Sequence, residues 1–185
     1  MNIVLFGPQG SGKGTQAQLL AEKFGFFYFE SGAYLRRIAE DNEELRKALD
    51  EGQLVPDIEF TSYLKAFFDE QSLYDDIIFD GFPRTLEQYK FLKEWLVEKQ
   101  ATLDLGIVLE ISEDETVKRL LLRKREDDTP DAIKKRLSLY RSRTQVLIDE
   151  ISKDTKVIEI NGERSVEEIQ KDLVEIVENV KNVKN

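Results

Sequence analysis

The sequence contains no cysteine and no histidine among its 185 residues. Without cysteine the chain can form neither a disulfide nor a thiolate metal site, so we expect no structural zinc and a cytoplasmic location. Without histidine, every mechanism that needs a histidine base is excluded. No segment reaches the roughly 18 apolar residues of a membrane-spanning helix, and the N-terminus lacks the pattern of a signal peptide. We therefore expect a protein with no membrane partner.

Acidic residues outnumber basic ones along most of the chain. The formal net charge is −10, which argues against broad binding to nucleic acid. The segment from residue 118 to 143 is an exception, because it carries ten Lys or Arg and only four Asp or Glu. Composition alone leaves open whether this segment is an ordinary solvated helix face or a binding region for a polyanion.

Short apolar runs alternate with helical patterns. The runs are nearly continuous, as expected for strands buried on both faces of a parallel sheet, and cover residues 2–6, 26–29, 77–80, 105–111 and 156–160. This alternation predicts a doubly wound α/β fold with a five-stranded parallel sheet flanked by helices. At about residues 30–71 several helical patterns follow one another without a strand, which predicts a small inserted lobe within a single domain.

Several residues mark expected helix ends. The first helix should end at Gly25, since glycine is the common C-terminal residue of helices. Ser112 with Glu115, and Ser165 with Glu168, have the spacing of capping boxes, in which each residue bonds the backbone N–H of the other. We expect a helix to begin at each pair.

The strongest local signal is the segment GPQGSGKGT at residues 7–15. It follows the first expected strand and opens the first expected helix, which is the context of a phosphate-binding loop. Glycines allow backbone N–H groups to approach phosphate oxygens, and the helix N-terminus adds its positive dipole end. Lys13 would bridge the terminal phosphates. Gly14 stands where Ser or Thr is usual and Thr15 is offset by one, so the common hydroxyl contact to magnesium is not expected here.

Further motifs follow the loop. They are Ser31-Gly32-Ala33-Tyr34-Leu35-Arg36, Gly52-Gln53-Leu54-Val55-Pro56-Asp57, Asp80-Gly81-Phe82-Pro83-Arg84-Thr85, Arg125-Glu126-Asp127-Asp128 with Arg136, and Asn161-Gly162. In this order, and with glycine after the lysine of the loop, they resemble the adenylate kinase family over nearly the whole chain. The match implies a phosphate-loop kinase with a monophosphate-binding insert at about 30–71 and a minimal lid at about 122–128. It is similar to the short-lid members, which have no zinc site.

The resemblance also implies the reaction and its partners. The reaction is reversible phosphoryl transfer from MgATP to AMP, giving two ADP, and we expect a monomer. Family members usually carry Asp where this chain has Ala33, which puts the detail of magnesium positioning in question. Asp80 ends an expected buried strand, where ligands of open α/β sheets bind, and would hold Mg²⁺ through water.

The resemblance assigns the remaining site residues. It places ATP against Gly10, Ser11, Gly12, Lys13, Gly14, Thr15, Arg119, Arg123 and Arg164. It places AMP against Ser31, Gly32, Arg36, Gln53, Leu54, Val55, Gly81, Phe82, Pro83, Arg84, Gln88, Arg125 and Arg136. It assigns catalysis to Lys13, Arg84, Arg123, Arg125 and Arg136. An array of cations suits the chemistry, because phosphoryl transfer needs alignment and charge neutralisation more than covalent help.

Gln88 is the residue expected to read the acceptor base. It lies four residues after Arg84, so on a helix that begins after Pro83 both would face one cleft. Its amide offers a donor beside an acceptor, which adenine can match. Cytosine offers a similar pair, and a free amide can flip to suit guanine, so Gln88 selects adenine only if its neighbours fix its orientation and the pocket is purine-sized.

Three other functions are less well supported by the sequence. Another nucleoside monophosphate kinase, for UMP or CMP, is the closest alternative, but such relatives tend to have Asn where this chain has Thr85. A GTP-dependent switch would need an Asn-Lys-x-Asp guanine signature, which the sequence lacks. An inactive nucleotide-binding module is suggested only by Ala33.

Overall fold

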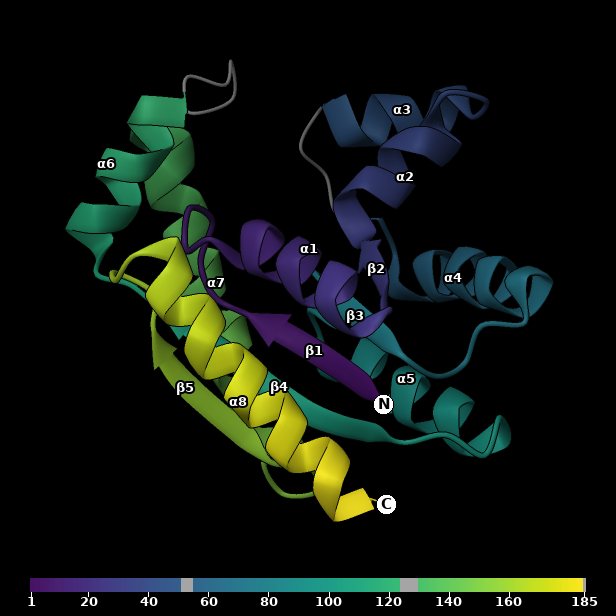
Figure 1. The fold of residues 1–185 in the computed structure, drawn as a ribbon. Helices are drawn as coiled ribbons and strands as arrows, with labels where there is room; N and C mark the ends of the chain where they lie inside the picture. The colour runs from purple at the N-terminus through teal and green to yellow at the C-terminus, as the bar shows by residue number, and fades with distance from the viewer. Residues whose placement is uncertain (51–54, 124–129, 185) are drawn as a thin grey trace.

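The computed structural model describes residues 1–50, 55–123 and 130–184. The strands are β1 (Asn2–Phe6), β2 (Phe27–Glu30), β3 (Ile77–Asp80), β4 (Leu103–Glu110) and β5 (Val157–Asn161). The helices are α1 (Lys13–Phe24), α2 (Ser31–Ala39), α3 (Glu43–Asp50), α4 (Asp57–Gln71), α5 (Leu86–Glu98), α6 (Glu113–Arg123), α7 (Pro130–Ile151) and α8 (Val166–Lys184) (Figure 1). Within the described ranges, no helix is both long and apolar enough to cross a membrane.

The strands form one parallel sheet in the order β2-β3-β1-β4-β5. This confirms the predicted α/β class and the predicted sheet. The runs at 2–6 and 77–80 match their strands, whereas those at 26–29 and 156–160 are one residue early and that at 105–111 starts two residues late. Apolar runs locate a buried strand well, but its ends depend on hydrogen bonds to neighbouring strands, which a local pattern does not contain.

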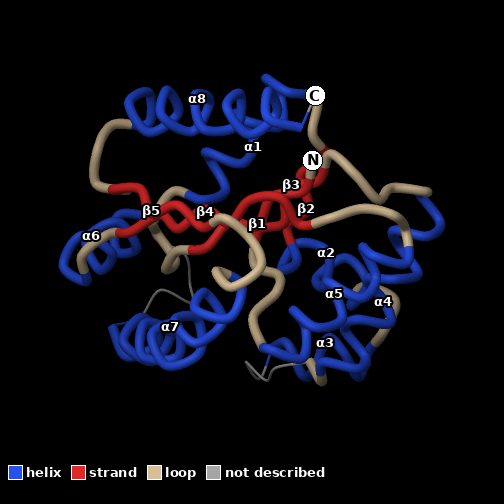
Figure 2. Tube along the Cα trace, turned by 90° about the horizontal axis from the view of Figure 1, so that it is seen from below, coloured by secondary structure: helices blue, strands red, loops and turns tan. Residues whose placement is uncertain are grey.

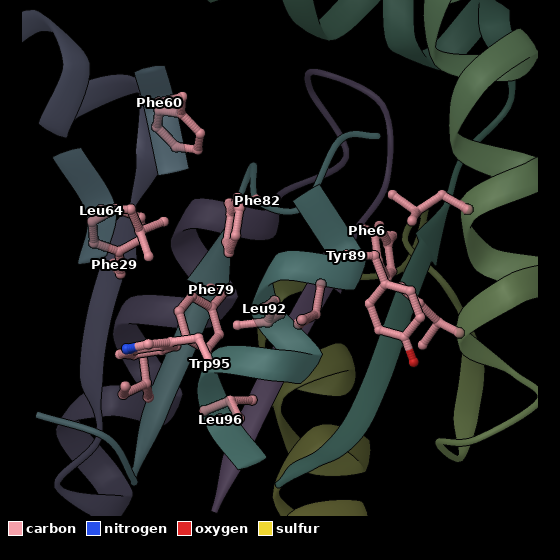
Figure 3. Close-up of a cluster of buried hydrophobic side chains, with 14 of the residues drawn as sticks. Phe6, Phe29, Phe60, Leu64, Phe79, Phe82, Tyr89, Leu92, Trp95 and Leu96 are labelled. Carbon is pink, nitrogen blue, oxygen red and sulfur yellow. The ribbon is translucent and has the colours of Figure 1, made fainter. Parts of the chain in front are cut away.

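Successive residues of β1 enter two separate cores, because side chains of a strand alternate between its faces. Ile3 and Leu5 pack with residues of α1 and α8 on one face, and Val4 and Phe6 pack with residues of α5 and α7 on the other. Figure 2 shows α1 and α8 together on one side of the sheet. The second core is rich in aromatic rings (Figure 3). All four of these β1 side chains are buried, which explains the continuous apolar run.

The segment between β2 and β3 contains α2, α3 and α4, and no strand among its described residues. The predicted run of helices is therefore confirmed. Aromatic rings join it to the edge of the sheet: the Phe29 ring of β2 lies 4.9 Å from that of Phe68 and 5.5 Å from that of Tyr34, between ring centroids. Contacts at these distances add to the apolar burial of the rings.

The expected helix ends are mostly observed. Gly25 ends α1 with a positive φ of 72°. Ser165 and Glu168 form the full capping box, with both backbone N–H groups bonded to the opposite side chain at 3.0 and 3.2 Å. The other box is only half formed. The Glu115 N–H donates to Ser112 Oγ at 3.3 Å, but the Ser112 N–H donates to a glutamate of the β5–α8 turn, because the Glu115 carboxylate is engaged further along its own helix.

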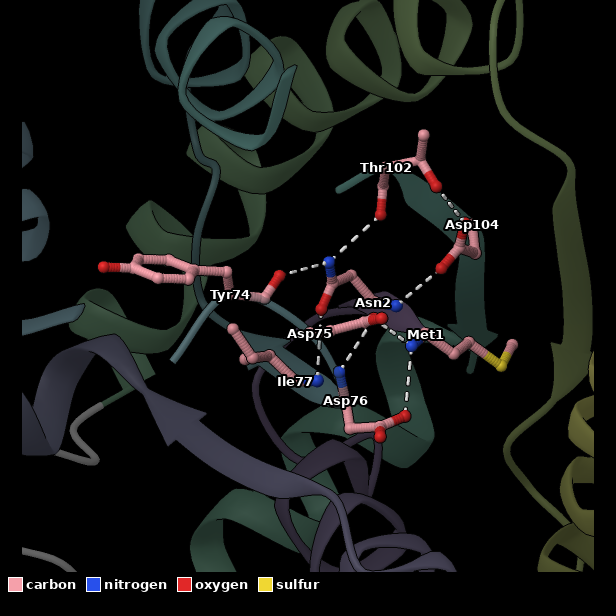
Figure 4. A network of polar contacts seen from close by, with 8 residues as sticks. All are labelled: Met1, Asn2, Tyr74, Asp75, Asp76, Ile77, Thr102 and Asp104. Carbon is pink, nitrogen blue, oxygen red and sulfur yellow. Dashed lines mark hydrogen bonds and ion pairs between the residues drawn. The ribbon is translucent and has the colours of Figure 1, made fainter. Parts of the chain in front are cut away.

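A polar network closes the N-terminal edge of the sheet (Figure 4). The Asn2 amide, which is fully buried, donates to the carbonyls of Tyr74 and Thr102 at 3.0 and 3.1 Å and accepts from the Ile77 N–H at 3.2 Å. The amino group of Met1 pairs with two neighbouring aspartates. These bonds tie β1 to the starts of β3 and β4. The amino ends of these strands therefore stabilise the fold, and the carboxyl ends at the opposite side of the sheet are available for a site.

Candidate active site

The carboxyl ends of all five strands meet at one edge of the sheet, where ligands of open α/β folds bind. The β1 strand leads directly into the loop at residues 7–12, which ends where α1 begins at Lys13. Gly10 and Gly12 in this loop have φ values of 85° and 92°. The predicted strand, loop and helix are thus observed in the order that a phosphate-binding loop requires.

Lys13 folds back onto its own loop. Its Nζ donates to the carbonyl oxygens of Gly7 at 2.6 Å and of Pro8 at 2.9 Å. Burial lowers the pKa of Lys13 to about 8; the nearby Asp80 carboxylate opposes this shift and the Arg84 guanidinium adds to it. Backbone carbonyls thus hold the lysine charge. A bound phosphate group would take their place and accept a stronger, charge-assisted hydrogen bond.

Asp80 ends β3 and is buried, with 9% of its surface exposed. Its Oδ2 accepts a hydrogen bond from the Tyr28 hydroxyl at 3.0 Å. Burial, and then the Asp80 charge, raise the pKa of Tyr28, so that its hydroxyl stays a donor. The apolar run at 26–29 predicts only a buried strand and does not indicate a site role for Tyr28. The available signal was its place three residues before Ser31, near the carboxyl end of a strand.

Gly14 is explained by the same contact. A Cβ built on Gly14 would lie 3.3 Å from the Tyr28 hydroxyl oxygen and 3.8 Å from Asp80 Oδ2. The place of the usual Ser or Thr is therefore taken by the tyrosine. Thr15, the next hydroxyl along, is exposed on α1. Ser11 is buried, and its Oγ has no hydrogen-bond partner among the described atoms.

Ser31, Gly81 and Arg84 form a second centre across the same edge. The Gly81 carbonyl accepts from Ser31 Oγ at 2.7 Å and from Arg84 Nε at 2.6 Å. Arg84 Nη2 lies 3.4 Å from Ser31 Oγ. Gly81 has a φ of 77°, and a Cβ there would lie 2.6 Å from Ser31 Oγ, so both its conformation and its space require glycine.

The neighbours of this centre differ in exposure. Phe82 and Pro83 are buried and joined by a cis peptide bond, and Val55 is buried in the core on the same side of the sheet. Arg36 is largely exposed and pairs with Glu30 at 3.4 Å. It follows Gly32, whose built Cβ would lie 3.3 Å from Arg36 Nη1. A phosphate bound here would meet Arg84 from the sheet side and could draw Arg36 away from Glu30.

The expected helix after Pro83 begins later than predicted. Leu86 is the first residue of α5, and Thr85 is its N-cap, accepting the Gln88 N–H at 3.1 Å. Arg84 therefore lies before the helix, and the prediction that it shares a helix face with Gln88 is wrong. The two still meet, because the Arg84 N–H donates to Gln88 Oε1 at 2.7 Å. Thr85 and Gln88 have capping-box spacing, a signal that could have located the helix start.

Arg119 connects the phosphate loop to the β5–α8 turn. Its Nη1 donates to the Gly162 carbonyl at 2.9 Å and lies 3.4 Å from that of Gly10, while its Nε donates to Glu115 at 2.7 Å. Gly162 itself approaches the loop closely, since a Cβ there would lie 3.2 Å from the Ser11 carbonyl oxygen. Three distant segments of the chain thus meet around one guanidinium.

The other predicted cations are placed differently. Arg164 donates to Asp172 of α8 at 2.7 Å and lines a cavity of about 300 Å³ between β5 and α8. Ala33 is exposed on α2. Residues Gln53, Leu54 and Arg125, and the side chains of Arg123 and Arg136, lie outside the described residues. The same holds for most of the expected lid at 122–128.

A phosphate loop after the central strand, with a second arginine-bearing centre at the neighbouring strand end, defines a phosphotransferase of the nucleoside monophosphate kinase class. A family model described as adenylate kinase matches residues 5–156. Adenylate kinases of Azobacteroides pseudotrichonymphae, Bacteroides thetaiotaomicron and Mycolicibacterium vanbaalenii are 38%, 39% and 40% identical to the chain. The matches cover 97%, 96% and 88% of this chain and 98%, 98% and 92% of the relatives. The chain belongs to the adenylate kinase family.

Proposed function

We propose that the chain transfers a phosphoryl group reversibly from MgATP to AMP, giving two ADP. The observation that carries this proposal is the proximity of the two centres. Leu5 of β1 and Asp80 of β3 are paired in the sheet, so the loop of Lys13 and the loop of Arg84 leave neighbouring strand ends. The charges of Asp80 and Arg84 both act on the pKa of Lys13, as expected for groups that lie close together.

The chemistry needs no general base. The phosphate of AMP has a second pKa of about 6, so near neutral pH it is largely a dianion and a ready nucleophile. Lys13 would leave the carbonyls of Gly7 and Pro8 to bind the terminal phosphates of ATP. Arg84, with Ser31 beside it, would bind the acceptor phosphate. These groups then hold donor and acceptor in line and neutralise the charge that develops in transfer.

The carboxylate at the carboxyl end of β3 is a ligand of the kind that Mg²⁺ takes. Mg²⁺ keeps several waters and takes one or two carboxylates together with substrate phosphates, and Asp80 is a buried carboxylate beside the phosphate loop. Asp80 would hold the metal together with the ATP phosphates, and the ion would supply positive charge that offsets the charge of those phosphates. Tyr28 holds Asp80 in place through its hydroxyl, so that the carboxylate is oriented before the nucleotide arrives.

Several finer expectations belong to the same proposal. The insert at about 30–71 and the lid at about 122–128 would close over the nucleotides and exclude water, which otherwise leads to hydrolysis of ATP. Arg123, Arg125 and Arg136 would reach the transferring group from the lid side. The protein would act as a cytoplasmic monomer without a nucleic-acid partner.

A coupled assay of ADP formation tests the proposal. ATP is paired in turn with AMP, CMP, UMP and GMP. We expect AMP to be preferred by roughly 10²-fold or more in kcat/KM, because a site built to hydrogen-bond one base rejects those that leave its polar groups unpaired. Lys13→Met should abolish nearly all transfer in a folded protein. Equal rates with UMP or CMP would contradict the choice of acceptor, and near-normal turnover of Lys13→Met would contradict the phosphate-loop assignment.

A further inference from the structure

Asp57 makes a partly buried connection between two helices at the acceptor side of the site. It is the first residue of α4, and its two oxygens accept hydrogen bonds from residues at the start of α5. Oδ1 accepts from Gln88 Nε2 and Oδ2 accepts from Thr85 Oγ1, each at 2.7 Å. Thr85 in turn accepts the Gln88 N–H at 3.1 Å. The two bonds to Asp57 hold the start of α4 against the start of α5, and the third lies within the start of α5.

These bonds decide which way the Gln88 amide faces. The Arg84 N–H can only donate, and it lies 2.7 Å from Oε1; the Asp57 carboxylate can only accept, and it lies 2.7 Å from Nε2. A flipped amide would set two donors against each other and two acceptors against each other. Gln88 is 6% exposed, so water cannot easily relieve either conflict. The Arg84 N–H and the Asp57 carboxylate therefore both favour the same orientation of the Gln88 amide.

The fixed amide has one N–H of Nε2 and one lone pair of Oε1 left for a ligand. Adenine presents an acceptor at N1 beside a donor at N6, which matches this pair in order. Hypoxanthine has the same size but the reverse order, a donor at N1 beside an acceptor at O6. It could be matched only by a flipped amide.

We propose that Asp57 is a positioning residue for base selection: by fixing the Gln88 amide, it makes the acceptor site prefer adenine to a purine of reversed polarity. The inference rests on the proposed function, since it concerns the acceptor base of that reaction. Asp57 acts on the base only through Gln88. Removing Asp57 leaves the Arg84 N–H as the one partner in the described part of the chain that opposes a flip, so discrimination should fall without disappearing.

The test compares AMP with IMP as acceptors for the wild type, Asp57→Ala and Glu59→Ala. Glu59 is the matched control, because it is an exposed acid in the same first turn of α4 and its bond among the described residues, to Tyr63, stays within its own helix. We expect Asp57→Ala to lower the ratio of kcat/KM for AMP to that for IMP by about tenfold, through a higher KM for AMP and a lower KM for IMP. Glu59→Ala should keep the wild-type ratio.

Two further variants make the result decisive. Asp57→Asn can keep its Oδ1 toward Gln88 while its amide donates to Thr85 Oγ1, so it should restore most of the ratio even if Asp57→Ala is less stable. A merely structural role would lower both kcat/KM values together and leave the ratio unchanged, which would overturn the inference. Failure of the proposed function would appear already in the wild type, as no transfer to AMP, whereas Gln88→Ala tests whether Gln88 reads the base. If Gln88→Ala loses the preference and Asp57→Ala keeps it, only the role of Asp57 is wrong; if Gln88→Ala keeps it too, the base is read elsewhere.

Discussion

Replacing Gly81 with alanine should damage the acceptor centre far more than it damages the fold. Gly81 has a φ of 77°, and its carbonyl accepts from both Ser31 and Arg84. An added Cβ would lie 2.6 Å from Ser31 Oγ and 2.8 Å from Arg84 Nη2. Both distances are too short for real contacts. The substitution must therefore displace the two polar groups that are assigned to the acceptor phosphate.

Gly25 provides a matched control for the backbone cost. Its φ is 72°, and apart from its two chain neighbours no described heavy atom would lie within 4 Å of a Cβ there. Alanine in the left-handed region costs about 1–2 kcal/mol at either position. For a chain of this size that corresponds to a fall of roughly 2–8 °C in Tm. Gly25→Ala should show only this fall, whereas Gly81→Ala adds the displacement of Ser31 and Arg84.

Steady-state kinetics and ATP binding distinguish the two effects. We expect Gly25→Ala to keep kcat/KM for AMP within about twofold of the wild type. Gly81→Ala should lower it by roughly 10²-fold, the usual loss when one charge-stabilising donor is misplaced. Its Kd for ATP should stay near the wild-type value, because the phosphate loop lies on another strand end. Wild-type kcat/KM for AMP in folded Gly81→Ala would refute the reasoning, as would equal losses in both variants.

The remaining predictions concern charge and closure. Burial lowers the pKa of Lys13 to about 8, so the free protein loses this positive charge as the pH rises through that value. Calorimetry should therefore show weaker ATP binding above this pH. In Lys13→Arg the ATP affinity should stay constant from about pH 7 to 10. Over the same range the ATP-free protein should gain stability from this group, because the unfolded chain binds the proton more tightly. Arg119→Ala should raise KM for ATP roughly tenfold and leave KM for AMP unchanged, whereas Lys118→Ala, which removes another partner of the same glutamate, should change neither. Two adenosines bridged by five phosphates should bind far more tightly than AMP, and equal affinities would argue against two adjoining sites. Ala33→Asp should leave stability unchanged because position 33 is exposed, and a large loss in a thermal melt would contradict that placement.

Sequence patterns predicted the parts of the molecule that depend on neighbouring residues. The apolar run of β1 is buried on both faces, and the glycines after it adopt the positive φ values that a phosphate-binding loop requires. The full capping box of Ser165 and Glu168 is likewise local. In each case the physical cause lies within a few residues, so a single segment contains the information.

Contacts between distant segments escaped the same reasoning. Tyr28 and Asp80 are 52 residues apart, and Asp57 and Gln88 are 31 apart. The chain brings each pair together only through the parallel pairing of β2 with β3 or the packing of α4 on α5. Asp57 belongs to the motif at residues 52–57, but a sequence motif does not indicate which distant side chain it contacts. Orientation of the Gln88 amide was therefore left open by the sequence.

The loop, β2 and β3 together explain a departure that the sequence showed without a reason. In most phosphate loops a Ser or Thr after the lysine places a hydroxyl between the loop and the acidic residue of a neighbouring strand. Here Gly14 has no side chain to fill that space. The Tyr28 hydroxyl fills it instead and lies 3.0 Å from Asp80 Oδ2. The hydroxyl is thus retained but supplied from β2. Because Tyr28 lies on β2, the orientation of Asp80 depends on the strand that leads into Ser31, the first residue of α2. The carboxylate proposed to hold Mg²⁺ and the residues proposed to bind the acceptor are therefore joined through β2.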